Sequence, residues 1–197
     1  PISTPTSTAT PTATPTSGST SDPVFVGAGD IAECDRQDDE ATADLLDAIP
    51  GTVYTLGDNA YDYGTAQEFA DCYEPSWGRH KARTRPSVGN HEDRTAGAVP
   101  YFEYFGAAAG DPDKGYYSYN LGEWHIVVLN SNCSDVSGGC GAGSTQELWL
   151  RQDLAANPAA CTLAYMHHPL FSSGKYGVNS DMEDFWQALY DYGADIV

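Results

Sequence analysis

Apolar and polar positions alternate along the chain in a rhythm that predicts strands and helices in turn. Short apolar runs rich in β-branched and aromatic residues, each ending at a glycine or a polar residue, are typical of buried strands. Such runs occupy residues 24–30, 52–58, 85–90 and 161–168. Residues 115–130 predict two further strands that run antiparallel and turn at Leu121-Gly122.

Helices are predicted between these strands. Residues 38–49 carry apolar side chains at helical spacing, and Pro50 ends the pattern. Two more helices are indicated by a serine followed three residues later by a glutamate, the capping-box spacing of Ser144 with Glu147 and of Ser180 with Glu183. Residues 194–197 begin a last strand. This alternation of strands and helices defines the α/β class.

The first 22 residues, by contrast, consist almost entirely of Pro, Thr, Ser, Ala and Gly. Such a segment buries too little apolar surface to offset the entropy lost on ordering. We therefore expect residues 1–22 to form a disordered Thr/Ser/Pro-rich linker, which can tether the protein to a cell surface or wall. Residues 23–197 then form the folded domain, and its 41% hydrophobic content is enough for a core.

The charge balance narrows the possible partners. The formal net charge is -19, from 28 acidic and 9 basic residues. Binding to a nucleic-acid backbone needs clustered Lys and Arg, so nucleic acid is not expected as a partner. No apolar run is long enough to span a bilayer, so membrane insertion is not expected either. The acidity fits a soluble protein that is secreted to the extracellular space.

The cysteines indicate whether the protein is found in an oxidising compartment. There are five, and none of them forms a Cys-x-x-Cys pair that would indicate a thiolate zinc site. Cys133 and Cys140 bracket a short Gly/Ser-rich stretch that suits a disulfide loop. Cys34 and Cys72 can form a second bridge, which leaves Cys161 over. The alternative, five free thiols in a cytosolic protein, is disfavoured by the Thr/Pro-rich start of the chain.

Polar residues follow four of the predicted strands directly, and they are Asp30, Asp58, Asn90 and His167. Ligand sites in α/β sheets collect at the carboxyl ends of strands, so these residues can converge although they lie far apart in the sequence. A single Gly-Asp pair is more often a simple turn. The four together offer the donor atoms that divalent and trivalent metals prefer.

Four short blocks around these residues resemble a known family. The blocks "GDIA" (29–32), "GDNAY" (57–61), "GNHE" (89–92) and "MHHP" (166–169) are similar, in this order, to those of the calcineurin-like metallophosphoesterases. The resemblance runs from about Val24 to Val197. It implies an αββα sandwich of two mixed sheets flanked by helices, acting as a catalytic domain.

Two positions point to the purple acid phosphatase branch of that family. Most relatives carry a histidine two residues after the first aspartate, where this chain has Ala32. In the purple acid phosphatases, a tyrosine three residues after the second aspartate compensates, and Tyr61 stands there. A loss and a compensating gain at separate positions are harder to explain by chance than either alone.

The resemblance implies a dinuclear metal site that hydrolyses small phosphate monoesters, with diesters left open as substrates. Asp58 would bridge the two metals. Asp30 and Tyr61 would bind Fe(III), and Asn90 and His167 would bind a divalent metal (Fe, Zn or Mn). A hydroxide held by these metals would attack phosphorus in line.

The resemblance also implies roles around the metals. His91 would be the catalytic residue that stabilises the phosphoryl oxygens or protonates the leaving group. Glu92 would orient His91, and His168 would contact substrate or only pack. Asn130 could line the site, but a turn-capping role is favoured. Asn132 begins the tripeptide Asn-Cys-Ser, a glycosylation sequon.

One family block is absent from the sequence. The family completes both metals with a Gly-His-x-His block downstream of "ADIV", so we expect this chain to lack the C-terminal part of the domain and one ligand for each metal. The alternative function is a non-catalytic extracellular binding or scaffold module that keeps the same fold. A phosphodiesterase acting on nucleic acid is disfavoured by the charge.

Overall fold

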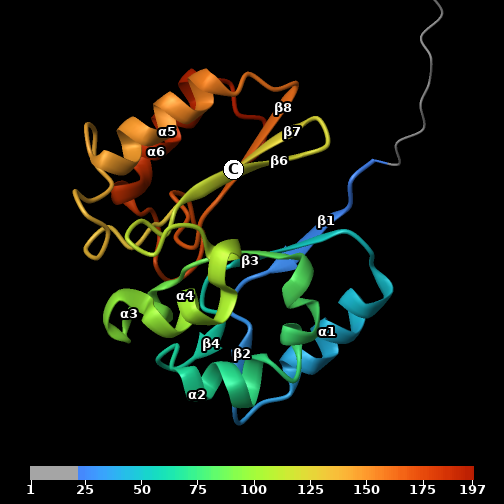
Figure 1. Cartoon of the computed structure of the whole chain (residues 1–197). Coiled ribbons are helices and arrows are strands. Elements are labelled where there is room, and N and C mark those ends of the chain that lie inside the picture. Colours follow the sequence, from blue (N-terminus) through green and yellow to red (C-terminus); the bar gives the residue numbers. More distant parts are fainter. Residues whose placement is uncertain (1–21) are drawn as a thin grey trace, which may run out of the picture.

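The computed structural model describes residues 22–197. Two three-stranded sheets lie face to face at its centre, and helices cover the outer face of each sheet (Figure 1). The expected αββα sandwich is therefore confirmed, although only the second of the two sheets is mixed in the described residues. The linker expected over residues 1–22 lies, apart from Asp22, outside the described residues.

The first sheet is parallel throughout its three strands, whose order is β1-β3-β5. These strands are β1 (Phe25–Ala28), β3 (Thr52–Leu56) and β5 (Thr84–Ser87). Parallel neighbours need a crossover connection, and helix α1 (Asp38–Ala48) lies in the connection from β1 to β3. A two-stranded parallel sheet, β2 (Ala32–Glu33) with β4 (Ala60–Tyr61), extends past the ends of β1 and β3.

Short helices and turns join α1 on the outer side of the first sheet. They are α2 (Ala66–Glu68), η1 (Phe69–Tyr73), η2 (Trp77–Arg83), α3 (Asn90–Asp93), η3 (Ala96–Ala98), α4 (Val99–Phe105) and η4 (Gly106–Ala109). Their aromatic side chains form one buried cluster in which Phe69, Tyr73 and Trp77 are almost fully enclosed. The strand expected over 85–90 is shorter than predicted, because the chain turns at Gly89 and Asn90 already begins α3.

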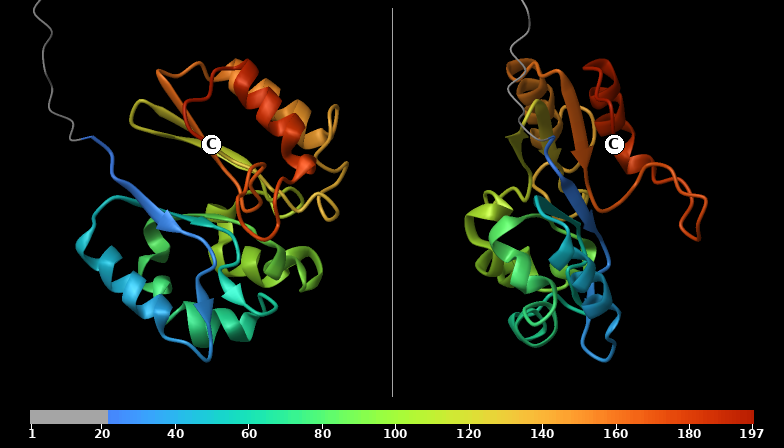
Figure 2. Two further views of the ribbon diagram at one scale, coloured as in Figure 1. Left: turned by 180° about the vertical axis from the view of Figure 1, so that it is seen from behind. Right: turned by 90° about the vertical axis from the view of Figure 1, so that its right-hand side faces the viewer.

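The second sheet is mixed and has the order β6-β7-β8. The strands β6 (Tyr117–Leu121) and β7 (Trp124–Val128) form the predicted antiparallel hairpin, and β8 (Cys161–Tyr165) runs parallel to β7. Ile196 pairs with Leu163 in parallel, so the expected last strand begins beside β8. Helices α5 (Thr145–Ala156) and α6 (Glu183–Asp191) pack on its outer face (Figure 2).

The two predicted capping boxes have different outcomes. Ser144 caps α5 as expected, because its side chain accepts a hydrogen bond from the backbone N–H of Glu147. The prediction for Ser180 was wrong. Asn179 caps a short 3-10 turn, η5 (Ser180–Met182), and α6 begins only after it. The asparagine immediately before Ser180 provides the oxygen that accepts from the backbone, so the serine is not needed as a cap.

Alternating side chains of the strands hold the two sheets together. Tyr54 and Leu56 of β3 face the second sheet, where they meet Ile126 and Val128 of β7, while Val53 faces the helices. The hydroxyl of Tyr165 also crosses the interface and donates to the carbonyl of Arg85 at 2.9 Å. This packing brings the end of β8 close to the ends of β1 and β3.

Both expected disulfides are present, Cys34–Cys72 and Cys133–Cys140. Cys161 is the free cysteine of the described chain. Within residues 22–197, no helix combines the length and the apolar character that crossing a membrane requires.

Candidate metal centre

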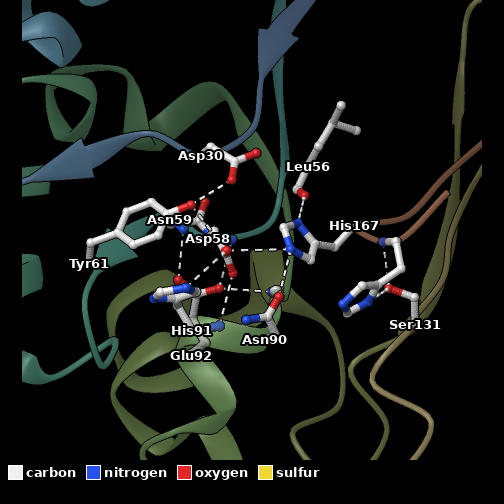
Figure 3. A network of polar contacts seen from close by, with 12 residues as sticks. Asp30, Leu56, Asp58, Asn59, Tyr61, Asn90, His91, Glu92, Ser131 and His167 are labelled. Carbon is white, nitrogen blue, oxygen red and sulfur yellow. Dashed lines mark hydrogen bonds and ion pairs between the residues drawn. The ribbon is translucent and has the colours of Figure 1, made fainter. Parts of the chain in front are cut away.

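The carboxyl ends of β1 and β3 and the loop after β8 meet at one edge of the sandwich, and the predicted metal ligands lie there (Figure 3). Asp30 and Asp58 follow the two strands in the left-handed backbone region, with φ of 56° and 50°. Residues other than glycine, asparagine and aspartate rarely adopt this backbone conformation. The strained turns aim both carboxylates at the same space.

Asp58 is the centre of this group, and it is only 3% exposed. Its Oδ1 accepts from the backbone N–H of His91 at 2.9 Å, and its Oδ2 lies 3.1 Å from the hydroxyl oxygen of Tyr61. Burial acts to raise the pKa of Asp58, but the neighbouring His167 and His91 outweigh it and lower the pKa below its ordinary value. Asp58 is therefore a carboxylate that can reach groups on both sides of the site.

Tyr61 faces two carboxylates at once. Its hydroxyl donates to Asp30 Oδ1 at 2.5 Å and lies 3.1 Å from Asp58 Oδ2. Burial, followed by the effects of Asp30 and Asp58, raises the pKa of Tyr61 well above its usual range. Three oxygen atoms thus surround one position, and a cation there would replace the phenolic proton.

On the other side of Asp58, His167 and Asn90 face each other. His167 Nδ1 lies 2.7 Å from the carbonyl oxygen of Leu56, which can only accept, so this nitrogen carries a hydrogen. Its Nε2 is directed toward Asn90 Oδ1 at 3.0 Å and Asp58 Oδ2 at 3.4 Å. Burial acts to lower the pKa of His167, but Asp58 outweighs it and raises the pKa. Both ring nitrogens thus face acceptor oxygens, and a cation that replaced the hydrogen on Nε2 would find this nitrogen beside two oxygen ligands.

Two glycines allow these groups to approach so closely. A Cβ atom at Gly89 would lie 2.2 Å from both the backbone N and Oδ1 of Asp58. A Cβ at Gly57, whose φ is +82°, would lie 2.9 Å from the Cβ of His167. The glycines of the "GD" and "GN" blocks are therefore required by the close contact between the two loops.

Glu92 acts on the backbone of the site. Its carboxylate is fully buried and accepts from four backbone N–H groups, those of Asp58, Asn59, Ala60 and Gly89. Burial and then the charge of Asp58 raise the pKa of Glu92 to about 7, while the N–H donors oppose that shift. The expectation that Glu92 orients the His91 ring is wrong in this structure, because both carboxylate oxygens accept hydrogen bonds from backbone N–H groups, three of them in the loop that carries Asp58.

The His91 ring is held instead by the carbonyl of Asp62, which accepts from Nδ1 at 2.8 Å. One face of the site is closed by Tyr61, whose ring centroid is 4.3 Å from that of His91. The Nε2 atom lies 3.7 Å from Asp58 Oδ2, and His91 borders the cavity described below. It is thus placed to exchange a proton with a group bound there.

The last two predicted site residues differ in position. His168 borders the cavity, and its Nδ1 is hydrogen-bonded to Ser131 at 2.9 Å. Asn130 is buried behind the site, where its side chain donates to the carbonyl of Lys114 and accepts from the N–H of Asn132. The turn-capping alternative is the correct one for Asn130. The sequon has no accessible acceptor, because the amide of Asn132 is buried and donates to the carbonyl of Gly89.

A cavity of about 690 Å³ lies over these groups. The sequence did not single out several of its lining residues, namely Arg94, Ser172, Tyr176, Gly177, Val178 and Asn179. Arg94 donates to the carbonyl of Asp62 at 3.0 Å. Arg94 lies two residues after the "GNHE" block, and this closeness in sequence was the one signal that could have indicated it.

The donor set is suited to two metals but is not a closed cage. Among residues 22–197, no three His, Cys, Asp or Glu side chains gather as a metal-binding group. On one side of the site, a metal would be bound by Asp58 and Asp30, with Tyr61 as a third ligand. On the other side, a metal would be bound by Asp58 and His167, with Asn90 as a third ligand. Such sites leave open positions, and the donor chemistry fits a hard trivalent ion on the phenol side.

Comparisons with known proteins support the fold. No sequence family and no curated protein matches the chain. Among solved structures, it is similar to a purple acid phosphatase isolated from seeds of yellow lupin (Lupinus luteus), with a TM-score of 0.66 and 19% identity over 87% of this chain. It is also similar to GAP50, described as the anchor in the inner membrane complex of Plasmodium, with a TM-score of 0.59 and 11% identity over 87% of this chain. The chain spans 36% and 63% of those two proteins.

Proposed function

We propose that residues 23–197 are part of a dinuclear-metal phosphatase that hydrolyses phosphate monoesters, and that diesters are a second substrate class. The carrying observation is the convergence of Asp30, Asp58 and Tyr61 with Asn90 and His167 on one wall of the cavity. These residues come from four separate parts of the sequence, and their donor atoms face one another across Asp58. The purple acid phosphatase fold supports this proposal.

In the proposed site, Asp58 would be shared by the two metals, Asp30 and Tyr61 would hold Fe(III), and Asn90 and His167 would hold a divalent Fe, Zn or Mn ion. When bound, such ions neutralise the phosphoryl charge and lower the pKa of water. The bond from phosphorus to the ester oxygen breaks, a water oxygen becomes the new phosphate oxygen, and the alcohol leaves with a proton.

The remaining polar groups of the cavity would act on the substrate. His91 lines the cavity and its Nδ1 is fixed by the carbonyl of Asp62, so Nε2 would be the nitrogen that gives a proton to the leaving oxygen. Arg94 brings a fixed positive charge to the same wall, where it would attract the phosphoryl group. His168 would contact the substrate from the opposite side.

We assign the protein to the extracellular space, with residues 1–22 as a linker that can tether the domain to a cell surface or wall. Two disulfides within the described residues support an oxidising environment. The net charge of -19 gives no support to a nucleic-acid substrate.

Replacing the bridging residue tests this function. Asp58→Asn removes the shared charge, so we expect metal content measured by elemental analysis to fall and turnover of p-nitrophenyl phosphate to drop by about 10³-fold or more. Glu103→Gln on exposed α4 is the matched control and should behave as the parent chain. An unaltered chain that folds, takes up neither metal and turns over no ester would contradict the proposal.

A second candidate function is a binding or scaffold module without catalysis. The structural similarity to GAP50, an anchor by its description, favours it. This module would bind no metal and would show no ester hydrolysis in any metal-loaded form. The same elemental analysis and turnover measurement therefore separate the two functions.

A further inference from the structure

Ser131, in the loop that follows β7, is bonded twice to a residue of the metal cavity (Figure 3). Its hydroxyl oxygen accepts from the backbone N–H of His168 at 2.9 Å and lies 2.9 Å from Nδ1 of the same residue. Ser131 is 3% exposed and does not line the metal cavity, whereas His168 does. The serine is thus placed to act on the cavity through the histidine.

The two contacts indicate which nitrogen of the His168 ring carries a hydrogen. The hydroxyl of Ser131 has a single hydrogen, and its oxygen already accepts from the backbone. Within residues 22–197, Nδ1 is the one group to which this hydroxyl can donate. If Nδ1 carried a hydrogen, the buried hydroxyl hydrogen would have no acceptor, which is unfavourable. The hydroxyl therefore donates to Nδ1, and the hydrogen of the neutral ring lies on Nε2.

Packing alone does not fix the ring of His168. The residue borders both the metal cavity and a second hollow of about 400 Å³. The ring of His167 meets it edge to face, with 4.7 Å between the ring centroids. The last torsion of a histidine side chain is broad, so open space on two sides leaves room for the ring to turn. The hydrogen bond between Ser131 and Nδ1 restricts that rotation.

The segment that carries Ser131 is itself held on both sides. The side-chain amide of Gln146, on α5, binds the backbone N–H and carbonyl of Asn130 at 2.8 and 2.9 Å. On the other side, Asn132 Nδ2 donates to the carbonyl of Gly89 at 3.1 Å. A serine between two anchored residues is a rigid support for a functional side chain.

We propose that Ser131 is a positioning residue, which orients His168 so that its Nε2 donates a hydrogen bond to a phosphoryl oxygen of the substrate. This inference rests on the proposed phosphatase function and adds the residue through which His168 is held. Nε2 forms no hydrogen bond within the described chain, so it is the ring nitrogen left for a ligand. A neutral donor of this kind binds the phosphoryl group in the ground state and in the transition state alike, so its loss affects KM more than kcat.

Ser131→Ala tests this role on the metal-loaded chain. We expect KM for p-nitrophenyl phosphate and the inhibition constant of inorganic phosphate each to rise by about five- to tenfold, with kcat within about twofold of the parent. Ser131→Thr keeps the hydroxyl and should stay within about twofold of the parent in all three values. Ser137→Ala, at an exposed serine, is the matched control and should behave as the parent chain.

A double variant separates positioning from a general loss of structure. His168→Ala should raise KM at least as much as Ser131→Ala does. Adding Ser131→Ala to it should change KM by less than about twofold, because the serine acts through a ring that is no longer there. Effects that multiply in the double variant, or an unchanged KM in Ser131→Ala, would overturn the proposal.

The ring of His168 also gives a readout that needs no ester. In NMR spectra of the chain before metal is added, its ring ¹⁵N signals should show the hydrogen on Nε2, and Ser131→Ala should shift them toward a mixture of the two neutral forms. If no ester is hydrolysed but this shift occurs, the phosphatase function fails and the positioning of the ring by Ser131 stands. Identical His168 signals with and without the hydroxyl would refute that positioning.

Discussion

Tyr61 stands out at the scale of single residues, because its hydroxyl lies against two carboxylates. Without a cation, burial and those carboxylates raise the pKa of the phenol. With Fe(III) between them, the phenol would lose its proton and give a charge-transfer band. Asp30 Oδ1, at 2.5 Å, is the closest of its partners.

Tyr61→Phe tests that assignment. We expect the iron-loaded variant to lose its visible absorbance, because phenylalanine provides no oxygen ligand, while its circular dichroism stays unchanged. The control is Tyr63→Phe, because Tyr63 is 56% exposed and does not border the cavity. A variant that keeps the full visible band would rule out Tyr61 as a ligand.

Glu92→Gln tests the backbone role of the buried carboxylate. The amide has one oxygen in place of two, so at least one of the four N–H donors loses its acceptor. We expect the free energy of unfolding in urea at pH 8 to fall by about 2 kcal/mol. Glu103→Gln should be within about 0.5 kcal/mol of the parent. A loss confined to activity would instead mean that Glu92 acts on the chemistry.

Much of the site could be predicted, since residues that end strands must meet at one edge of a sheet. The sequence therefore indicated Asp30, Asp58 and His167, which the structure brings together. It gave no indication that Glu92 would accept from backbone N–H groups. Buried contacts to the main chain leave no pattern in the side chains.

At the scale of elements, the short helix α2 is fixed by a complete capping box. Thr65 accepts from the N–H of Glu68, and Glu68 accepts from the N–H groups of Asp62, Tyr63 and Thr65. Burial acts to raise the pKa of Glu68, but these donors outweigh it and lower the pKa below 4.5. The box also fixes the loop that follows Tyr61.

This box makes stability depend on pH in one direction. The folded pKa of Glu68 lies below the unfolded value, so its contribution is present above about pH 4.5 and is lost as the pH falls through the folded pKa. We expect Glu68→Gln to be less stable than the parent at pH 7, with a difference that shrinks below pH 4.5 in urea unfolding. Thr65→Ala retains the carboxylate and should cost about 1 kcal/mol at pH 7. A difference for Glu68→Gln that is the same at pH 7 and pH 3 would contradict this account.

The elements themselves were predicted best where a single pattern decides them. The hairpin around Leu121-Gly122 and the helix capped by Ser144 are local, and both were confirmed. The error at Ser180 arose because two neighbouring residues can both cap, and the sequence does not say which one does. The shortened third strand depends on the contact of Gly89 with Asp58, which is separated from it by 31 residues.

For the whole molecule, the site connects two sheets. Asp30 and Asp58 follow strands of the first sheet, and His167 follows β8 of the second. A metal pair bound by both sheets would stabilise only the folded arrangement. The binding free energy would therefore add to the free energy of unfolding.

We expect zinc with iron, at free concentrations about 100 times the Kd, to add about 2.7 kcal/mol to stability. For a chain of this size, that corresponds to a rise in Tm of roughly 5–10 °C, measured by differential scanning calorimetry and reversed by a chelator. Asp58→Asn should show no rise. The same rise in both proteins would place the metals elsewhere.

The hydrogen bond from His167 to the carbonyl of Leu56 joins positions 111 residues apart. During synthesis, Asp30, Asp58 and Tyr61 emerge early, while His167 emerges about a hundred residues later. The iron-side residues of the described chain therefore leave the ribosome long before His167, the last residue proposed for the second metal, is available. The order of translation would then let Asp30, Asp58 and Tyr61 meet before β8 brings His167 to the other side of Asp58.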